Sequence, residues 1–398
     1  VGDFEEGRTR AELIWSAAQM LSVMDLKLGA YFASLHLLES LESANPDHLC
    51  LSLTLEAVHL CGSAKGRAKA VELLRRAEGI LPDVQDTGYC SGFVAFGWGM
   101  LRYLEGHWVK SNEYFMNAEQ ILATQCKGVV WELDGARFYQ SFCQEHIGGF
   151  SWFNNRLPVY LDLARKRQDL LYTTNWRLWS YLTHLVRDEP ELANHEGDEA
   201  IKEWSTKTFL IQDFWWLISK AKIALYQNEP VWALDLIDSQ ASRLKRSLLL
   251  QNETVEMMTE EVQAQLSMAL LLDRQVDARM SRKLRSRCER HISTLSKSSL
   301  TFCSLRARGL SLQLAWLDGE RRTALKEAEL LFTLTMAEGM KPYAYALNML
   351  RALMIGLHEP LAMSLLEEAE RWFKAQDVKN PRAFARILCP VLSFLPET

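Results

Sequence analysis

The chain has 398 residues, a net charge of −5, 48% hydrophobic residues and 24% charged residues. This composition is too apolar for a disordered chain, and the weak negative charge predicts neither a nucleic acid nor a membrane surface as a partner. The 10 prolines and 20 glycines are few for the many turns of an all-β protein, so the composition favours helices.

Helical periodicity runs from about Arg8 to about Phe394 and predicts helices that follow one another in pairs. No apolar run reaches the roughly 18 residues of a membrane span. A final helix is predicted to begin near Pro381. The predicted pairs are 11–26 with 28–41, 46–61 with 66–80, the hairpin 91–122, 127–146 with 152–167, 170–185 with 191–204, 209–226 with 230–244, 253–272 with 279–295, 300–317 with 321–336, and 342–355 with 360–373.

The clearest hairpin is 91–122, with its turn at Gly106. Glycine enters the left-handed conformation that ends a helix at little cost. Trp98-Gly99 stands where the tetratricopeptide (TPR) pattern has Leu-Gly, and Ser111-x-x-x-Phe115 stands where it has Ala-x-x-x-Phe. A hairpin of this kind cannot bury both of its faces alone, so it predicts neighbours of the same kind.

A fixed distance separates the turn from the first small residue of the second helix. It is five residues in four hairpins: Lys65 to Ala70, Gly106 to Ser111, Asn228 to Ala233 and Gly319 to Ala324. The repeat period is somewhat above the roughly 34 residues of a strict TPR. The spacing predicts an all-α chain of TPR-like helical-hairpin repeats that forms a right-handed superhelical solenoid. We predict one domain over residues 1–398, with about nine hairpins and a C-terminal capping helix.

Two cysteine patterns that could carry chemistry are interpreted as structural. Gly88-x-Cys90-x-Gly92 fits a nucleophile elbow, but no strand precedes it, so we predict a loop at a helix start. Cys288 and His291 could share a metal ion, but a metal site needs more ligands than these two. Kinase, P-loop and dinucleotide signatures are absent from the sequence. We therefore expect no catalytic residue, no cofactor and no metal.

The densest charge cluster is basic and could hold phosphate or an acidic partner. The opposite side of the same predicted helix is apolar, so we predict that the cluster is a solvated outer face. Its members are Arg274, Arg279, Arg282, Lys283, Arg285, Arg287 and Arg290.

The eight cysteines are scattered and include no Cys-x-x-Cys pair. We interpret them as small buried side chains in a reducing compartment. The chain begins at Val1, among charged residues without the form of a signal peptide. We therefore expect a cytoplasmic protein and a piece of a longer polypeptide. The cysteines are Cys50, Cys61, Cys90, Cys126, Cys143, Cys288, Cys303 and Cys389.

The central part of the chain is rich in tryptophan, because eight of the 13 lie between Trp131 and Trp232. Trp215 and Trp216 are adjacent and cannot both face the same neighbouring helix. Aromatic side chains and arginine are common anchors for a partner, and packing between helices is the alternative interpretation. The candidate partner-binding residues are Trp131, Arg137, Trp176, Trp179, Trp215 and Trp216.

Several short segments carry a family resemblance. They are Trp15-Ser16, Gly29-Ala30, His36–Leu38, Gly128–Arg137, Asp169–Asn175, Trp204-Ser205, Phe214-Trp215 and Asn380–Leu388. Together they resemble the C-terminal helical-repeat region of large bacterial serine/threonine kinases of the planctomycete and myxobacterial type. Those proteins carry a kinase domain, an AAA/STAND-type ATPase module and TPR-like repeats. The resemblance spans nearly the whole chain and concerns scaffold positions only, so it implies a regulatory or sensor module and no catalytic residue.

We expect that this chain is not an enzyme. It is predicted to bind a protein or peptide in its concave groove and to regulate an upstream kinase or ATPase switch in the same polypeptide, with no nucleic acid and no membrane involved. One alternative is an α/α-toroid enzyme acting on sugars or lipids, with Glu132, Asp134 and Glu145 as candidate acids and bases. Another alternative is the recognition region of a STAND-type defence sensor.

Overall fold

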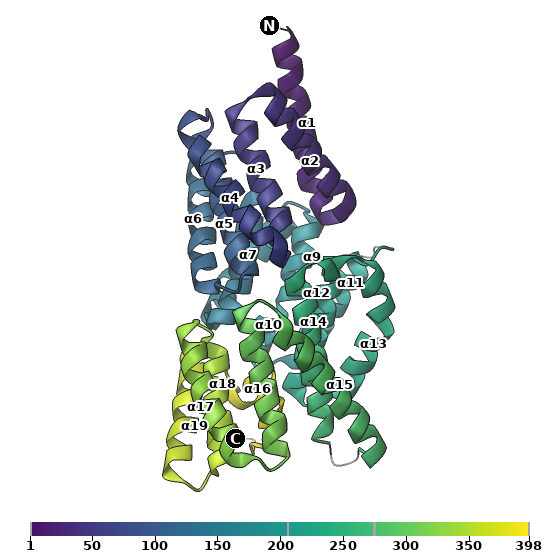
Figure 1. The fold of residues 1–398 in the computed structure, drawn as a ribbon, viewed down its shortest axis with the longest axis vertical. Helices are drawn as coiled ribbons and strands as arrows, with labels where there is room; N and C mark the ends of the chain where they lie inside the picture. The colour runs from purple at the N-terminus through teal and green to yellow at the C-terminus, as the bar shows by residue number, and fades with distance from the viewer. Residues whose placement is uncertain (1, 205–206, 274–275, 397–398) are drawn as a thin grey trace. The chain divides into compact units, whose positions relative to one another are not determined.

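The computed structural model describes residues 2–204, 207–273 and 276–396. Within these ranges most residues are helical and no strand is present, which confirms the all-α prediction. Many consecutive helices contact one another along the chain, which is consistent with a helical repeat. None of the described helices combines the length and the apolar character needed to cross a membrane. The chain divides into two compact units (Figure 1), and the single right-handed solenoid stays a prediction.

Unit 1 comprises residues 1–143 together with 251–253. Helices α1 and α2, α3 and α4, and α5 and α6 form three hairpins, and α3 contacts both α2 and α5. The hairpins therefore pack in chain order. The helices of unit 1 are α1 (Gly2–Met24), α2 (Leu26–Ser43), α3 (Pro46–Cys61), α4 (Ala64–Ile80), the short η1 (Leu81–Asp83), α5 (Thr87–Leu104), α6 (Trp108–Gln125) and most of α7 (Val130–Ile147).

Unit 2 comprises residues 144–250 and 254–398. Its hairpins include α12 with α13 and α18 with α19. The helices of unit 2 are the end of α7, α8 (Phe150–Lys166), α9 (Leu170–Trp179), α10 (Tyr181–Val186), α11 (Pro190–Trp204), α12 (Ile211–Gln227), α13 (Pro230–Arg246), α14 (Glu253–Leu271), α15 (Ala278–Lys297), α16 (Thr301–Leu317), α17 (Arg321–Ala337), α18 (Lys341–Ile355), α19 (Pro360–Ala375), α20 (Pro381–Arg386) and η3 (Pro390–Phe394), and η2 (Leu249–Gln251) lies where the two units divide.

Many hairpin turns are closed by one hydrogen-bond pattern. Gly106 has φ +84°, and the N–H of the next residue, His107, donates to the carbonyl oxygen of Arg102 at 2.9 Å. Residues with positive φ at Asp188, Asn228, Gly319 and Gly339 are followed by the same bond. Such a bond satisfies a carbonyl that the helix end leaves free. Five residues after each left-handed position lies a buried small residue, namely Ser111, Ala193, Ala233, Ala324 and Ala344.

One of the four predicted turn positions, Lys65, is wrong. Helix α4 begins at Ala64, because the Ser63 hydroxyl accepts the backbone N–H of Gly66 at 3.1 Å and caps the helix there. The turn therefore lies at Gly62 and Ser63, and Lys65 is helical.

Two further predictions on local structure are wrong. The predicted helix 170–185 is interrupted at Ser180, whose hydroxyl donates to the carbonyl of Arg177 at 2.7 Å and competes with the helical bonds there. The motif at residues 88–92 was predicted as a loop, but it lies within α5. That helix begins at Thr87, because the Asp86 carboxylate accepts the N–H of Tyr89 at 3.0 Å.

The α5–α6 hairpin packs closely because glycine lines its contact. A Cβ atom on Gly99 would lie 2.7 Å from Cδ1 of Phe115, which is fully buried. Close to the same point, the Ser111 hydroxyl donates to the Gly99 carbonyl at 2.8 Å. Gly99 and Ser111, two small residues of the TPR-like pattern, therefore lie where the two helices meet.

The last helices of unit 2 return to its first ones. Phe150 at the start of α8 packs edge-on against Phe384 of α20, with ring centroids 4.7 Å apart. A Cβ atom on Gly148 would lie 2.5 Å from Trp372 of α19. The N–H of Lys379 donates to the carbonyl of Val186 at 2.9 Å. Residues 144–398 therefore do not form an array whose two ends lie apart.

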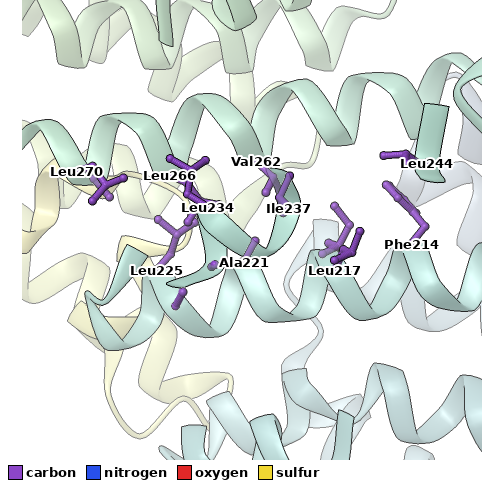
Figure 2. Packing of buried hydrophobic residues seen from close by; sticks show 14 of the residues in the cluster. Phe214, Leu217, Ala221, Leu225, Leu234, Ile237, Leu244, Val262, Leu266 and Leu270 are labelled. Carbon is purple, nitrogen blue, oxygen red and sulfur yellow. The ribbon is translucent and has the colours of Figure 1, made fainter. Parts of the chain in front are cut away.

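The middle of unit 2 contains a layered apolar core (Figure 2). Apolar side chains of α12 face those of α13 and α14. They are Phe214, Leu217, Ala221 and Leu225 of α12, Leu234, Ile237 and Leu244 of α13, and Val262, Leu266 and Leu270 of α14. The spacings of three and four residues along α12 place these side chains on one face. Two of the candidate partner-binding residues, Trp215 and Trp216, pack partly buried against this cluster, and so does Trp232.

We predict that Gly99→Ala destabilises the protein by about 1–2 kcal/mol, because its methyl group would overlap the Phe115 ring. Gly79→Ala is the matched control, since a Cβ atom there meets nothing within 4 Å in the same kind of helical backbone. It should stabilise the protein by about 0.5–1 kcal/mol. Urea unfolding followed by circular dichroism measures both changes, and equal effects of the two substitutions would contradict the packing argument.

Candidate partner-binding surface

Two of the predicted partner-binding residues are core residues. Trp176 is 0% exposed and packs against Tyr160 with ring centroids 5.3 Å apart. Trp179 is 1% exposed and packs edge-on against Tyr181 and Trp215. These two side chains fill space between helices α8, α9, α10 and α12, and they offer no surface to a partner.

Trp131 and Arg137 lie on α7 in unit 1 and are both partly exposed. The Arg137 guanidinium forms an ion pair with Glu119 at 2.9 Å and contacts Asp134 at 3.5 Å. Its charge is therefore balanced within its own unit, and a partner would have to compete with two carboxylates for it.

Trp215 and Trp216 of α12 are partly exposed and diverge, as the sequence predicts for neighbours on a helix. Trp215 turns towards Trp179, with ring centroids 6.3 Å apart. Trp216 turns towards α11, where its indole N–H donates to the Asp198 carboxylate at 3.0 Å. Gly197 does not limit this approach, since a Cβ atom there would lie at an ordinary contact distance of 3.8 Å from the ring. This hydrogen bond holds the Trp216 indole in one orientation.

A lysine beneath Trp216 fixes the same carboxylate. Lys220 is 3% exposed, and its ammonium lies 2.6 Å from Asp198 and 3.1 Å from the carbonyl oxygen of Asn194. Burial lowers the pKa of Lys220, and the Asp198 carboxylate opposes that shift. A buried ammonium needs a counter-ion. If Asp198 turned away from Trp216, the Lys220 ammonium would keep its hydrogen bond to Asn194 but would lose this carboxylate.

Helix α11 is acidic, and a second buried cation holds it to α9. Arg177 is 8% exposed and contacts the carboxylates of Glu196 at 3.1 Å and Glu203 at 2.6 Å. We name the surface made by Trp216, Asp198, Lys220, Glu196 and Glu203 the α11–α12 face. It presents a half-buried indole beside partly exposed carboxylates, and buried cations orient those carboxylates from below. Trp216 was predicted from the sequence, but its partners on α11 were not.

A second set of polar side chains converges in unit 2. Glu145 of α7 forms an ion pair with Lys222 of α12 and accepts the Tyr181 hydroxyl at 3.3 Å. The Arg306 guanidinium of α16 lies 4.1 Å from the centre of the Tyr343 ring and 3.2 Å from the Glu261 carboxylate. We name the residues Glu145, Lys222, Tyr181, Arg306, Tyr343 and Glu261 the polar interior of unit 2.

His146 lies next to this polar interior. Burial lowers its pKa well below the usual range, and the positive charges of Arg306 and Lys222 lower it further. The imidazole is therefore neutral at physiological pH.

The three carboxylates of the toroid alternative are each satisfied by the chain itself. Glu132 accepts the Tyr89 hydroxyl at 2.5 Å and the Gln19 amide at 2.8 Å. Asp134 lies beside Arg137, and Glu145 is paired with Lys222. Because Glu132 and Asp134 are two residues apart on one helix, they point in nearly opposite directions. These contacts describe structural carboxylates.

The other candidate motifs have structural surroundings where they are described. Cys288 is 0% exposed, and burial raises the pKa of its thiol to about 12. His291 pairs with Glu260 at 2.7 Å, and no group of three metal-binding side chains occurs among the described residues. In the basic run, Arg285 and Arg287 form ion pairs with Asp318 and Asp238, whereas Arg274 lies outside the described residues.

Three of the nine histidines are concentrated where α3 meets the first hairpin. His36 of α2 is 0% exposed, and its Nε2 lies 3.1 Å from Nδ1 of His48 on α3. His59 of α3 lies 3.4 Å from the Ser22 hydroxyl of α1. Burial, followed by the charge of His48, lowers the pKa of His36 to about 4, and burial also lowers that of His59. By contrast, His184, His291 and His358 each lie beside a glutamate.

We predict that protonation destabilises unit 1 between pH 7 and pH 4. An unfolded histidine takes up its proton near pH 6.5, whereas folded His36 does so only at about 4. The unfolded state therefore binds more protons between these values, and His36 alone should remove about 3 kcal/mol of stability by pH 4. Urea unfolding at several pH values measures the slope. His36→Phe should flatten it and the exposed-site control His358→Phe should not; the same slope in all three proteins would contradict the assignment.

We also predict strong coupling between Glu145 and Lys222. Each single substitution, Glu145→Gln or Lys222→Met, leaves one largely buried charge unpaired and should cost about 3–5 kcal/mol. The double substitution should cost much less than the sum of the two, because it removes both charges. A double-mutant cycle measured by urea unfolding gives the coupling energy, and additive costs would mean that solvent screens this pair.

Comparison with known proteins adds no assignment to this geometry. No family model matches the chain, and no curated protein matches it. The argument for function therefore rests on the residues and contacts described above.

Proposed function

We propose that the chain is a non-catalytic helical-repeat module that binds a protein or peptide partner through the α11–α12 face. The observation that carries the proposal is Trp216, an indole that is partly exposed and held in one orientation. Its N–H binds Asp198, and Lys220 fixes that carboxylate from below. A rigid aromatic side chain loses little conformational entropy when a partner covers it, which is why tryptophan is frequent at the centre of interfaces.

The carboxylates around Trp216 favour a partner with basic or amide groups. The Glu203 and Asp198 side chains are about half exposed although each also contacts a buried cation. A partner that donates hydrogen bonds could use the remaining lone pairs of these oxygens without leaving Arg177 or Lys220 unpaired. The cost of binding would then be small, because no buried charge has to be separated from its counter-ion.

The wider setting is part of the same proposal. The TPR-like spacing at the hairpin turns and the resembling segments support a regulatory region of a bacterial serine/threonine kinase with an AAA/STAND-type ATPase module. In that setting the repeats would form a right-handed superhelix, and partner binding would control the kinase or ATPase switch. The recognition region of a STAND-type defence sensor would use the same surface in the same way.

One observation favours the α/α-toroid enzyme as a second candidate. The return of α19 and α20 to the start of α8 is the contact that a closed ring of hairpins makes. An acid–base pair also needs two carboxylates about 5–10 Å apart with room for a substrate. Glu145 would be one of them, but its carboxylate is already engaged by the Lys222 ammonium. The binding role is therefore the stronger candidate.

The test compares Trp216→Ala with Trp232→Ala. Trp232 is a suitable control because it is also half-buried and packs against the same core cluster. Proteins captured from an extract of the source cells on the immobilised chain are identified and quantified by mass spectrometry for each variant. We expect Trp216→Ala to lose at least one partner that Trp232→Ala and the unaltered chain retain, with unchanged circular dichroism.

The opposite result is equally clear. If both variants retain the same partners, or if Trp216→Ala lowers helicity where Trp232→Ala does not, then Trp216 is a packing residue. The α11–α12 face would then not be the binding surface.

A further inference from the structure

The outward side of α2 carries an apolar stripe that the other helices of unit 1 leave uncovered. Leu28, Tyr31, Leu35 and Leu38 are separated by three, four and three residues. Leu28, Tyr31 and Leu38 are 46%, 61% and 59% exposed, and Leu35 is partly exposed. Alternating steps of three and four residues form the seam by which one helix packs lengthwise on another. The opposite side of α2, with Ala33 and His36, is buried.

Helix α1 has a stripe of the same kind. Leu13, Ala17 and Met20 follow one another at four and three residues, and Leu13 and Met20 are 67% and 69% exposed. The buried side of α1 lies opposite, at Ile14 and Ala18. The first hairpin is therefore apolar on two sides, although only one side is covered within unit 1.

The exposed apolar surface of this hairpin is large for a single chain. At these exposed fractions a large apolar side chain leaves on the order of 100 Å² uncovered. Six such side chains leave roughly 600 Å² uncovered, which is the upper end of the largest patch of a typical monomer, about 300–600 Å², and a large part of the roughly 800 Å² that each partner contributes to a stable interface. The six are Leu13, Met20, Leu28, Tyr31, Leu38 and Leu41.

We propose that this face, made by α1 and α2, is an interface between two copies of the chain. The second copy presents a helical hairpin with the same apolar spacing, so its side chains can cover these stripes. In a two-fold dimer each patch meets its own equivalent, so α2 packs antiparallel against α2 of the partner. This proposal concerns unit 1 and does not depend on the role of Trp216.

The charges at the two ends of α2 select the antiparallel arrangement. Lys27 lies at the start of α2 and Glu42 near its end, both exposed and both beside the apolar stripe. Antiparallel packing places Lys27 of one copy opposite Glu42 of the other. Parallel packing would place like charges opposite each other, which disfavours that arrangement.

The experiment is sedimentation velocity on the full chain over a wide range of protein concentration. The unaltered chain should sediment as a dimer that dissociates on dilution. Leu38→Glu, which places a charge on the seam, should raise the dissociation constant roughly 30-fold or more. Leu361→Glu on α19 is the matched control, because Leu38 and Leu361 are each 59% exposed. It should leave the dimer unchanged.

A charge exchange tests the geometry. Lys27→Glu and Glu42→Lys should each weaken the dimer, and the double variant should restore it, because antiparallel pairs then regain opposite charges. Tyr31→Glu provides a second seam variant in case Leu38→Glu lowers helicity.

Three results would overturn the proposal. One is a monomer at every concentration, which would assign the face to another occupant. Another is a dimer that Leu38→Glu and Tyr31→Glu do not weaken. The last is equal weakening by Leu361→Glu, which would show a general effect of charge.

Discussion

The hydrogen bond that closes the hairpin turns sets much of the remaining structure. It joins the N–H that follows a left-handed residue to the carbonyl five positions before that N–H, as between His107 and Arg102. This bond fixes where the second helix starts, and the small residue five positions after the turn then meets the first helix. That geometry brings the two helices of a hairpin into close contact, as at Gly99 and Ser111. It thereby also sets which side chains are buried and which remain partly exposed.

The helical pairs could be predicted because apolar periodicity and turn chemistry are local. The wrong boundaries arose where a side chain competes with the backbone, as the Ser180 hydroxyl does for a helical carbonyl and the Ser63 hydroxyl does by capping α4. The tryptophans of α12 were predicted as a candidate site, but the burial of Trp176 and Trp179 depends on which helices pack around them. Ion pairs such as Glu145 with Lys222 join distant parts of the sequence, and no local pattern reports them.

Three buried cations of unit 2 are each paired with carboxylates of the same unit. Arg177, Lys220 and Lys222 are largely buried, and each contacts at least one carboxylate. Their contribution is to orient the side chains above them, because breaking a buried pair costs more than forming it stabilises. The groups that we propose as contacts for partners are the partly exposed indole of Trp216 and the apolar stripes of α1 and α2, which belong to different units.

The return of α20 to α8 also determines how unit 2 can fold. In a linear repeat array each hairpin is stabilised by its neighbours, and structure can spread from any point. Here Phe150 gains its partner Phe384 only when the ends of the unit have met, and Arg386 binds the carbonyl of Tyr226 at 2.8 Å in the same closure. Contacts between residues so distant in sequence slow folding and tie the hairpins into one cooperative transition. During synthesis on the ribosome, the first hairpins of unit 2 therefore lack these contacts until the segment that begins near Asn380 has been made.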